Sequence, residues 1–301
     1  IAHFEFVMRG IRKAMDRFPD KAGDISLSLH CETAEIMSAY TKMVEEEGTL
    51  KGLPAYSAAR PPHSEGLAIF IAAYLANETD LPNINLLHLT SRKAVLAALQ
   101  MAAVFPHINF RREVTIGHLM LDTDSKAASL AKVNPPIRPR EDVDYLWEQL
   151  KAGNLDWVCS DHACCKHEMK VDKRKPGNIW LAKSGFGGTE YLLAALVSEG
   201  RKRGLTWNQM AALTSYNAAR RFGLHSKGDI AEGLDADLAL LDPDETWTVR
   251  AADSESQQGY TPFEGLELSG RVKTTFLRGQ RIYDGGQIVG KAIGRYLSRP
   301  Y

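Results

Sequence analysis

The sequence predicts an α/β protein: a TIM-type parallel β/α barrel or sheet, followed by a small β-sandwich appendage. Up to about residue 227, short apolar runs alternate with longer segments whose apolar residues have helical spacing. This alternation is typical of βα units around a parallel sheet. From Gly228 onward, short strands separated by turns such as Asp284-Gly-Gly replace the helical pattern. We therefore expect two domains, residues 1–227 and residues 228–301.

Three of the predicted strands end in side chains that are able to bind a metal. The apolar runs at 25–30, 81–88 and 155–161 finish at His30, His88 and Asp161, respectively. Active sites of β/α barrels lie at the carboxyl ends of the strands, so this recurrence favours a site there. Neutral imidazoles and carboxylates are suitable ligands for zinc-type metals. For any single strand, the alternative is an ordinary polar turn after a buried strand.

The other elements follow from local pattern. A further strand is expected over 109–119, and its His118 is either a site residue or, given its apolar neighbours, a core histidine. Glycine and proline predict loops at 48–63 and 132–138, and 166–188 is long enough to form a lid. Apolar periodicity predicts the helices, which are 4–18, 35–47, 67–75, 92–104, 141–151, 189–203 and 208–222. The late strands are expected at 237–242, 246–249, 271–277 and 281–283.

The composition indicates neither a nucleic-acid partner nor a membrane partner. Of the 301 residues, 44% are hydrophobic and 25% charged, and 37 basic residues balance 37 acidic ones. No apolar run approaches the length of a membrane span, and the first residues have no signal-peptide pattern. The four cysteines have no regular spacing, which is typical of a reducing compartment. We expect a cytoplasmic protein.

Several short motifs resemble, in order and spacing, those of one enzyme family. The motifs are His30-Cys-Glu32, His88-Leu-Thr-Ser91, Asn134-Pro-Pro-Ile-Arg138, Ser160-Asp-His-Ala163, Gly185-Phe-Gly-Gly-Thr-Glu190, Gly228-Asp-Ile-Ala-Glu-Gly233 and Pro262-Phe-Glu-Gly265. Together they resemble the cyclic amidohydrolases, the group that contains dihydroorotases, hydantoinases, dihydropyrimidinases and allantoinases. The resemblance covers essentially the whole chain.

Within this group the sequence is most similar to allantoinases. Residues 161–170 and 177–179 carry that similarity, whereas 260–265 fits hydantoinases equally well. Dihydroorotases usually have a histidine that holds the substrate carboxylate where Cys165 stands here, which counts against that activity. Cys164 replaces a usual proline, and Ile116-Gly117 replaces Pro-His. These departures leave the identity of the ring substrate open.

Two features of the family have no counterpart in this sequence. Members carry a His-x-His pair on the first barrel strand and a carbamylated lysine on the fourth, which bridges two metals. His3-Phe-Glu5 is not such a pair, because it lies on the predicted opening helix. We expect the chain to start just after the fourth strand and to hold only the C-terminal half of the barrel. It would then have four barrel strands, not a closed ring, and lack the upstream metal ligands.

The resemblance implies hydrolysis of a cyclic amide or ureide C–N bond by metal-activated hydroxide, with an allantoinase as the first candidate. His30, His88 and Asp161 would bind divalent metal, two zinc ions per site in the complete protein. Asp161 would also act as general base and then general acid. The residues that would contact the small cyclic substrate are Asn134, Gly187, Gly188 and His162.

Other interpretations stay open. A hydantoinase or dihydropyrimidinase is the nearest alternative, and a non-catalytic dihydropyrimidinase-like scaffold or an inactive fragment is another. Retention of His30, His88 and Asp161 weighs against a scaffold, which needs no ligands at three strand ends. For His162, a purely structural hydrogen bond is the alternative to a place at the substrate. A homo-oligomer, a tetramer or a dimer, is the expectation from the family.

Overall fold

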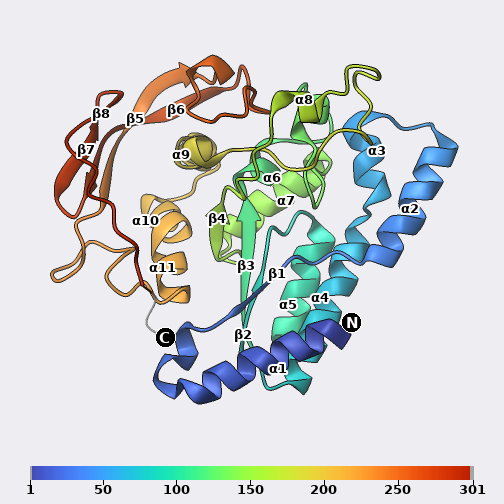
Figure 1. Ribbon diagram of the computed structural model, residues 1–301, viewed down its shortest axis with the longest axis horizontal. Coiled ribbons are helices and arrows are strands. Elements are labelled where there is room, and N and C mark those ends of the chain that lie inside the picture. The colour runs from blue at the N-terminus through green and yellow to red at the C-terminus, as the bar shows by residue number, and fades with distance from the viewer. Residues whose placement is uncertain (1, 299–301) are drawn as a thin grey trace.

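Residues 2–298 of the computed structural model are described here, and they form two separate β-sheets with helices around and between them (Figure 1). The first sheet is parallel, with its strands in chain order: β1 (Leu27–Leu29), β2 (Asn83–Leu86), β3 (Asn109–Thr115) and β4 (Trp157–Cys159). Leu29 pairs with Leu86, and Thr115 pairs with Cys159, so successive strands end near one edge. The architecture is that of a partial β/α barrel, as the sequence predicts.

The helices of this half cover the sheet with alanine-rich and apolar faces. Helix α4 (Pro62–Glu78) packs on α5 (Arg92–Val104), and both lie beside the strands in Figure 1. Ser91 caps α5 as expected, because its hydroxyl accepts a hydrogen bond from Ala94 N at 3.2 Å. The predicted helices at either end of this region are also present: α1 (Ala2–Arg17), α2 (Ala34–Glu47) and α7 (Arg140–Lys151).

The predicted loop at 48–63 is wrong, because most of it is helical. Helix α3 spans Gly52–Ala59, and α4 begins at Pro62. Proline is tolerated in the first turn of a helix, where its missing N–H would have had no partner inside the helix. Pro54 and Pro62 occupy such positions, so here proline marks helix starts. The buried Leu53, Ala55 and Tyr56 then pack α3 against the rest of the protein.

Two further elements differ from expectation, since one strand ends early and one helix is interrupted. The strand expected over 109–119 stops at Thr115, and Ile116–Met120 forms the short helix α6. Thr115 caps α6 by accepting a hydrogen bond from His118 N at 3.2 Å. The helix expected over 208–222 is interrupted: α10 (Trp207–Ala211) and α11 (Asn217–Arg221) flank a π-helical turn at Ala212–Tyr216. Before them, a 3₁₀ turn at Thr189–Tyr191 leads into α9 (Leu192–Lys202).

The second sheet is antiparallel and lies at the C-terminal end of the chain. Its strands are again in chain order: β5 (Leu238–Thr248), β6 (Glu267–Leu277), β7 (Gln280–Asp284) and β8 (Gln287–Ile288). The strands expected at 237–242 and 246–249 are parts of one strand, β5, with an irregularity in between. Helices α9 to α11 stand between the two sheets (Figure 1). A domain boundary at residues 227/228 stays a prediction.

No helix within residues 2–298 combines the length and the apolar character needed to cross a membrane.

Candidate functional site

The rings of His30 and His88 meet at the carboxyl end of the parallel sheet. His30 directly follows β1, and His88 lies two residues past the end of the neighbouring strand β2. Because β1 and β2 pair in parallel, both side chains reach the same edge of the sheet. His30 Nδ1 lies 2.9 Å from His88 Nε2, and the ring centroids are 4.6 Å apart in a T-shaped arrangement. Two of the predicted ligands therefore converge, although 58 residues separate them.

His88 is a neutral imidazole at physiological pH. Burial, together with the neighbouring rings of His30 and His118, lowers its pKa to about 3. Its backbone N–H donates to Glu113 Oε1 at 3.1 Å, which anchors the turn after β2. Among the residues that the structure describes, none is a hydrogen-bond partner of the buried Nδ1 atom of this ring. A neutral ring with one nitrogen aimed at a second imidazole suits a metal ligand.

His30 is oriented from its other side by an ion pair that sequence reasoning did not single out. His30 Nε2 lies 2.8 Å from Glu32 Oε2, and Arg60 donates to both carboxylate oxygens of Glu32 at 3.0 and 2.7 Å. Burial alone would raise the pKa of Glu32, but hydrogen bonds from His30 and Arg60 hold that pKa below its usual value. The sequence signal was an acid two residues after His30. Arg60, the partner of Glu32, lies in the segment 48–63 that the sequence had indicated as a loop.

Asp161 occupies the end of a third strand, β4, as predicted. Its backbone adopts a left-handed conformation with φ 45°, uncommon for a residue other than glycine. Burial raises the pKa of its carboxyl group, and the nearby His30 opposes that rise. Within residues 2–298, no three His, Cys, Asp or Glu side chains gather closely enough to hold a metal ion. The structure thus brings His30 and His88 together and places Asp161 nearby. The roles of all three residues as metal ligands stay predictions.

His162 is hydrogen-bonded to the segment that contains Gly187 and Gly188, and its ring packs closely against Gly187. His162 Nδ1 lies 3.0 Å from Thr189 Oγ1 and accepts from Gly188 N at 3.3 Å. Gly187 N donates to Gln258 Oε1 at 2.8 Å, and a Cβ atom on Gly187 would lie 2.7 Å from His162 Cε1. These are structural contacts, and they occupy the amide hydrogens of both glycines. The contacts of His162, Gly187 and Gly188 with a substrate stay predictions.

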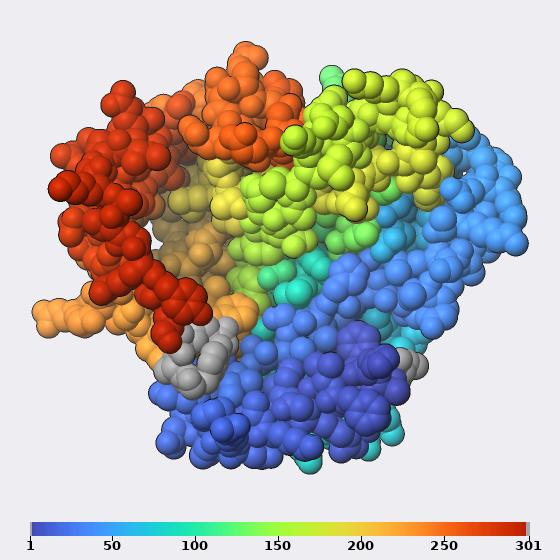
Figure 2. Space-filling view, viewed as in Figure 1, coloured from blue at the N-terminus to red at the C-terminus, as the bar shows by residue number. Residues whose placement is uncertain are grey.

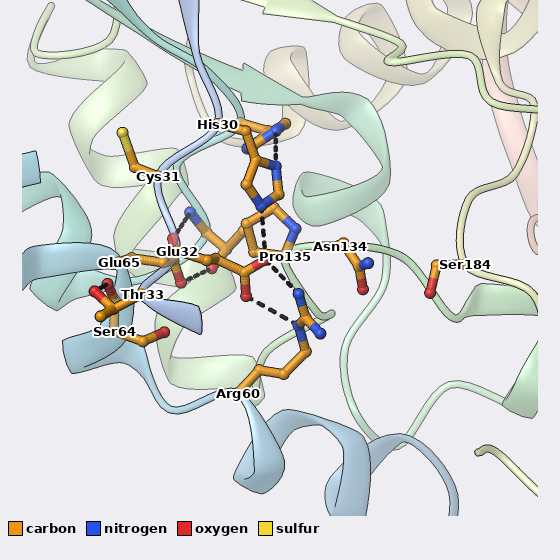
Figure 3. Close-up of polar contacts among 12 residues, drawn as sticks. His30, Cys31, Glu32, Thr33, Arg60, Ser64, Glu65, Asn134, Pro135 and Ser184 are labelled. Atoms are coloured by element: carbon orange, nitrogen blue, oxygen red, sulfur yellow. Dashed lines mark hydrogen bonds and ion pairs between the residues drawn. The ribbon is translucent and has the colours of Figure 1, made fainter. Parts of the chain in front are cut away.

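Asn134 lies between Pro135 and Ser184 in Figure 3. Its Oδ1 atom accepts a hydrogen bond of 2.6 Å from the hydroxyl of Tyr56, which also lies 3.3 Å from Ser184 Oγ. Tyr56 comes from α3, the helix that sequence reasoning had assigned to a loop. The amide of Asn134 is therefore held in one orientation, and its proposed contact with substrate stays a prediction.

His118 is a core histidine. Both ring nitrogens have partners, Thr115 Oγ1 at 2.7 Å and the carbonyl oxygen of Pro135 at 2.9 Å. Because a carbonyl only accepts, Nε2 carries the proton and Nδ1 accepts from Thr115. Burial lowers the pKa of His118 to about 4. The ring fixes the backbone next to Asn134 and leaves no nitrogen for a ligand.

The segment 166–188 lies at one side of the molecule. It lies between the C-terminal sheet and helices α2 and α3 in Figure 2. It contains the short helix α8 (His167–Lys170), and the buried ammonium of Lys132 donates to Ile179 O at 2.8 Å and Ala182 O at 2.7 Å. Lys170 Nζ is also buried and donates to Lys132 O at 2.8 Å. The segment is thus attached to the partial barrel, and its role as a lid stays a prediction.

An imidazole pair at the ends of adjacent parallel strands, with a carboxylate at the end of another, lies where active sites of β/α barrels are found. The model of the amidohydrolase family matches residues 9–282. The chain belongs to that family.

The curated relatives include allantoinases. The protein from Rubrobacter xylanophilus is 37% identical over 273 residues, which cover 89% of this chain and 58% of the relative. The one from Salmonella gallinarum is 33% identical over 264 residues, covering 87% of this chain and 56% of the relative. This chain therefore spans little more than half of the length of these relatives.

The solved structures that resemble the chain include hydantoinases and a dihydropyrimidinase. L-Hydantoinase from Arthrobacter aurescens aligns with a TM-score of 0.82 and 28% identity, over 89% of this chain and 59% of the other. Dihydropyrimidinase from Brevibacillus agri aligns with a TM-score of 0.79 and 28% identity, over 89% of this chain and 58% of the other. These similarities confirm the family and the partial-barrel fold that the sequence predicts.

Proposed function

We propose that the protein hydrolyses a C–N bond of a cyclic ureide, as the allantoinases it resembles are named for doing. The observation that carries the proposal is the pair of ring nitrogens, His30 Nδ1 and His88 Nε2, which face each other 2.9 Å apart at the end of the parallel sheet. The identities of 37% and 33% to allantoinases favour the ureide allantoin as substrate.

The residues at this edge fit a divalent metal. Both imidazoles are at the edge of the sheet, and the low pKa of His88 keeps its ring neutral and able to donate a lone pair. We assign His30, His88 and Asp161 as ligands, with zinc as the metal and two ions per site in the complete protein. A bound zinc-type metal supplies hydroxide at neutral pH and polarises the scissile carbonyl.

Asp161 would carry the proton between the two halves of the reaction. Its carboxylate would accept a proton from the attacking water and pass it to the ring nitrogen that leaves. The raised pKa of Asp161, caused by burial, favours such a proton carrier. Substrate contacts are assigned to Asn134, Gly187, Gly188 and His162.

A hydantoinase or dihydropyrimidinase is the second candidate. The observation that favours it is the close similarity to solved structures of both enzymes, with TM-scores of 0.82 and 0.79. We further propose a homo-oligomeric enzyme of the cytoplasm. The four cysteines, all of which are unpaired, support a reducing compartment.

The first test is the metal content of the purified chain by mass spectrometry, with a His30→Ala/His88→Ala double variant as the control. We expect metal in the parent protein that the double variant loses. Equal metal in both would exclude these histidines as ligands. Turnover of allantoin, hydantoin, dihydrouracil and dihydroorotate then identifies the ring.

Replacement of Asp161 by Asn should abolish turnover and leave folding intact. Asparagine tolerates the left-handed backbone at this position, so the fold has no reason to change. Asp16→Asn, an exposed change on α1, is the matched control and should keep full activity. Steady-state rates and circular dichroism on the three proteins check this, and unchanged turnover in D161N would remove Asp161 from the mechanism.

A further inference from the structure

We propose that Glu32 and Arg60 are positioning residues that fix the tautomer of His30, so that its Nδ1 atom keeps a free lone pair directed at the metal position. The inference rests on the proposed function for the identity of the ligand, and it adds the two residues that prepare that ligand. Figure 3 shows the Glu32 carboxylate lying between the His30 ring and the Arg60 guanidinium.

The contact with Glu32 decides which nitrogen of the His30 ring carries the proton. An ionised carboxylate only accepts hydrogen bonds, and a neutral imidazole has one N–H and one lone pair. Since Glu32 Oε2 lies 2.8 Å from His30 Nε2, the proton belongs on Nε2. Nδ1 is then the lone-pair nitrogen, and it is the atom that faces His88. Histidines that bind metals commonly donate their other N–H to a carboxylate in this way.

Arg60 keeps Glu32 ionised and in place. Its side chain is 0% exposed, and a buried carboxylate requires a cation and hydrogen bonds. Arg60 provides both through two hydrogen bonds in a fork, which a lysine cannot reproduce. The backbone carbonyl of Arg60 accepts a hydrogen bond from Arg138 at 2.7 Å. The guanidinium of Arg60 lies over the Tyr56 ring.

The two histidines differ in burial. The His88 ring is buried, and within residues 2–298 its Nδ1 atom has no hydrogen-bond partner. Packing therefore holds His88, with its Nε2 atom in contact with His30. The side chain of His30 is 43% exposed, so packing alone cannot hold its ring, and a directed hydrogen bond has to do so. The Glu32–Arg60 pair supplies that hydrogen bond at the ligand that needs it.

The test uses Glu32→Gln, which keeps the size of the side chain and removes its charge. Glu32 Oε2 serves both Arg60 and His30, whereas Oε1 serves Arg60 alone. Glutamine has a single acceptor oxygen, so in either orientation of its amide an NH₂ group faces a donor of Arg60, and the ionised acceptor that fixed the proton on His30 Nε2 is lost. We expect the Nδ1–H tautomer to become populated beside the Nε2–H tautomer, and the affinity for Co²⁺ to fall about 10- to 100-fold.

Two measurements on the metal-free and metal-titrated chain report these effects. Long-range ¹H–¹⁵N spectra of histidine-labelled protein give the tautomer at about pH 8, above the ordinary histidine pKa, with His30→Ala identifying the signals. Competition with a chromophoric chelator gives the Co²⁺ dissociation constant. The matched control is Asp156→Asn, which removes a buried carboxylate that also binds arginine, at Arg111 and Arg112, away from the histidines. It should change neither readout.

Arg60→Lys is a second, milder variant. Glu32 stays an acceptor, so the Nε2–H tautomer is kept, but the fork is lost and Co²⁺ binding weakens. Wild-type tautomer and affinity in both E32Q and R60K would overturn the positioning role while leaving the metal site in place. If the parent chain binds Co²⁺ no better than the His30→Ala/His88→Ala variant, the proposed metal site fails. The tautomer of His30 in E32Q then still decides the role of Glu32.

Discussion

Two buried histidines in this protein are held by opposite means. Both ring nitrogens of His118 have partners, and a satisfied ring of this kind stabilises the core. In the described part of the chain, one nitrogen of His88 has no partner, and the other nitrogen faces His30. Buried polar atoms without a hydrogen-bond partner are rare in folded proteins, and a functional role is one explanation for them. At the scale of single residues, hydrogen-bond satisfaction therefore separates the structural histidine from the candidate ligand.

His118 should make the stability of the protein depend on acid. Its folded pKa, about 4, lies below the unfolded value near 6.5. Between those values the unfolded chain binds more protons, so stability is complete above about pH 6.5 and is lost as the pH falls toward about 4. The expected loss is about 3 kcal/mol from this residue.

Urea denaturation of His118→Gln across this pH range checks the contribution. Glutamine keeps a donor for the Pro135 carbonyl but does not titrate, so the slope of stability against pH should become shallower. His107→Gln, an exposed position, should keep the parent slope. Parallel slopes for H118Q and the parent would show that His118 is not protonated on unfolding.

At the scale of elements, the segment 166–188 owes its position to buried lysines. Lys132 reaches three carbonyl oxygens, and its ammonium lies 4.5 Å from the centre of the Tyr56 ring. Burial lowers the pKa of Lys132 to about 8, so the charge is retained at neutral pH. Carbonyl oxygens and an aromatic face replace water around this ammonium. The contacts tie the loop to α3 and to the segment before Asn134.

Lys132→Met should loosen this loop. Methionine keeps the length of the side chain but leaves the carbonyls of residues 179, 180 and 182 without their donor, and unsatisfied buried carbonyls are costly. We expect faster amide hydrogen exchange over 171–184, with less change in the parallel sheet. Lys183→Met, exposed in the same loop, is the control. Equal exchange in the two variants would show that Lys132 does not hold the loop.

At the scale of the whole molecule, one apolar core joins the parallel sheet to the antiparallel sheet through α9. The buried Val197 on α9 and Leu268 on β6 belong to the same cluster as Leu86 and Val114 of the parallel sheet. Ser269 N donates to Ser198 Oγ at 3.1 Å across the same contact. Gly270 permits the close approach, because a Cβ atom there would lie 3.0 Å from Val197 Cγ1.

Gly270→Ala should destabilise the protein more than Gly286→Ala. Both glycines have positive φ, +102° and +94°, so an alanine is strained at either position. Only at Gly270 does the added methyl group meet another side chain, since Gly286 has open space around it. We expect an additional loss of about 1–3 kcal/mol for G270A, from overpacking. Equal free energies of unfolding would mean that the α9–β6 contact absorbs a methyl group freely.

The local pattern of the sequence was sufficient for most elements. Apolar periodicity located α1, α2, α5 and α7, and apolar runs located the four parallel strands, because burial repeats along a helix or strand with a fixed period. The failure at 48–63 came from interpreting glycine and proline as loop residues, when Pro54 and Pro62 lie in the first turns of helices. The short motifs from His30 to Gly265, taken together in their order and spacing, were sufficient for the family, which the comparison confirms.

The sequence by itself determined the class of the fold, the family and which side chains lie at strand ends, because each of these depends on patterns among residues close together in the chain. Only the tertiary structure decided which of those side chains meet. His30 finds His88 58 residues away, and Arg60 finds Glu32 28 residues away. Such partners are set by strand register and helix packing, which no local spacing encodes. For the same reason, the carboxylate that orients His30 was visible in the sequence as a residue and became an interaction only in the folded chain.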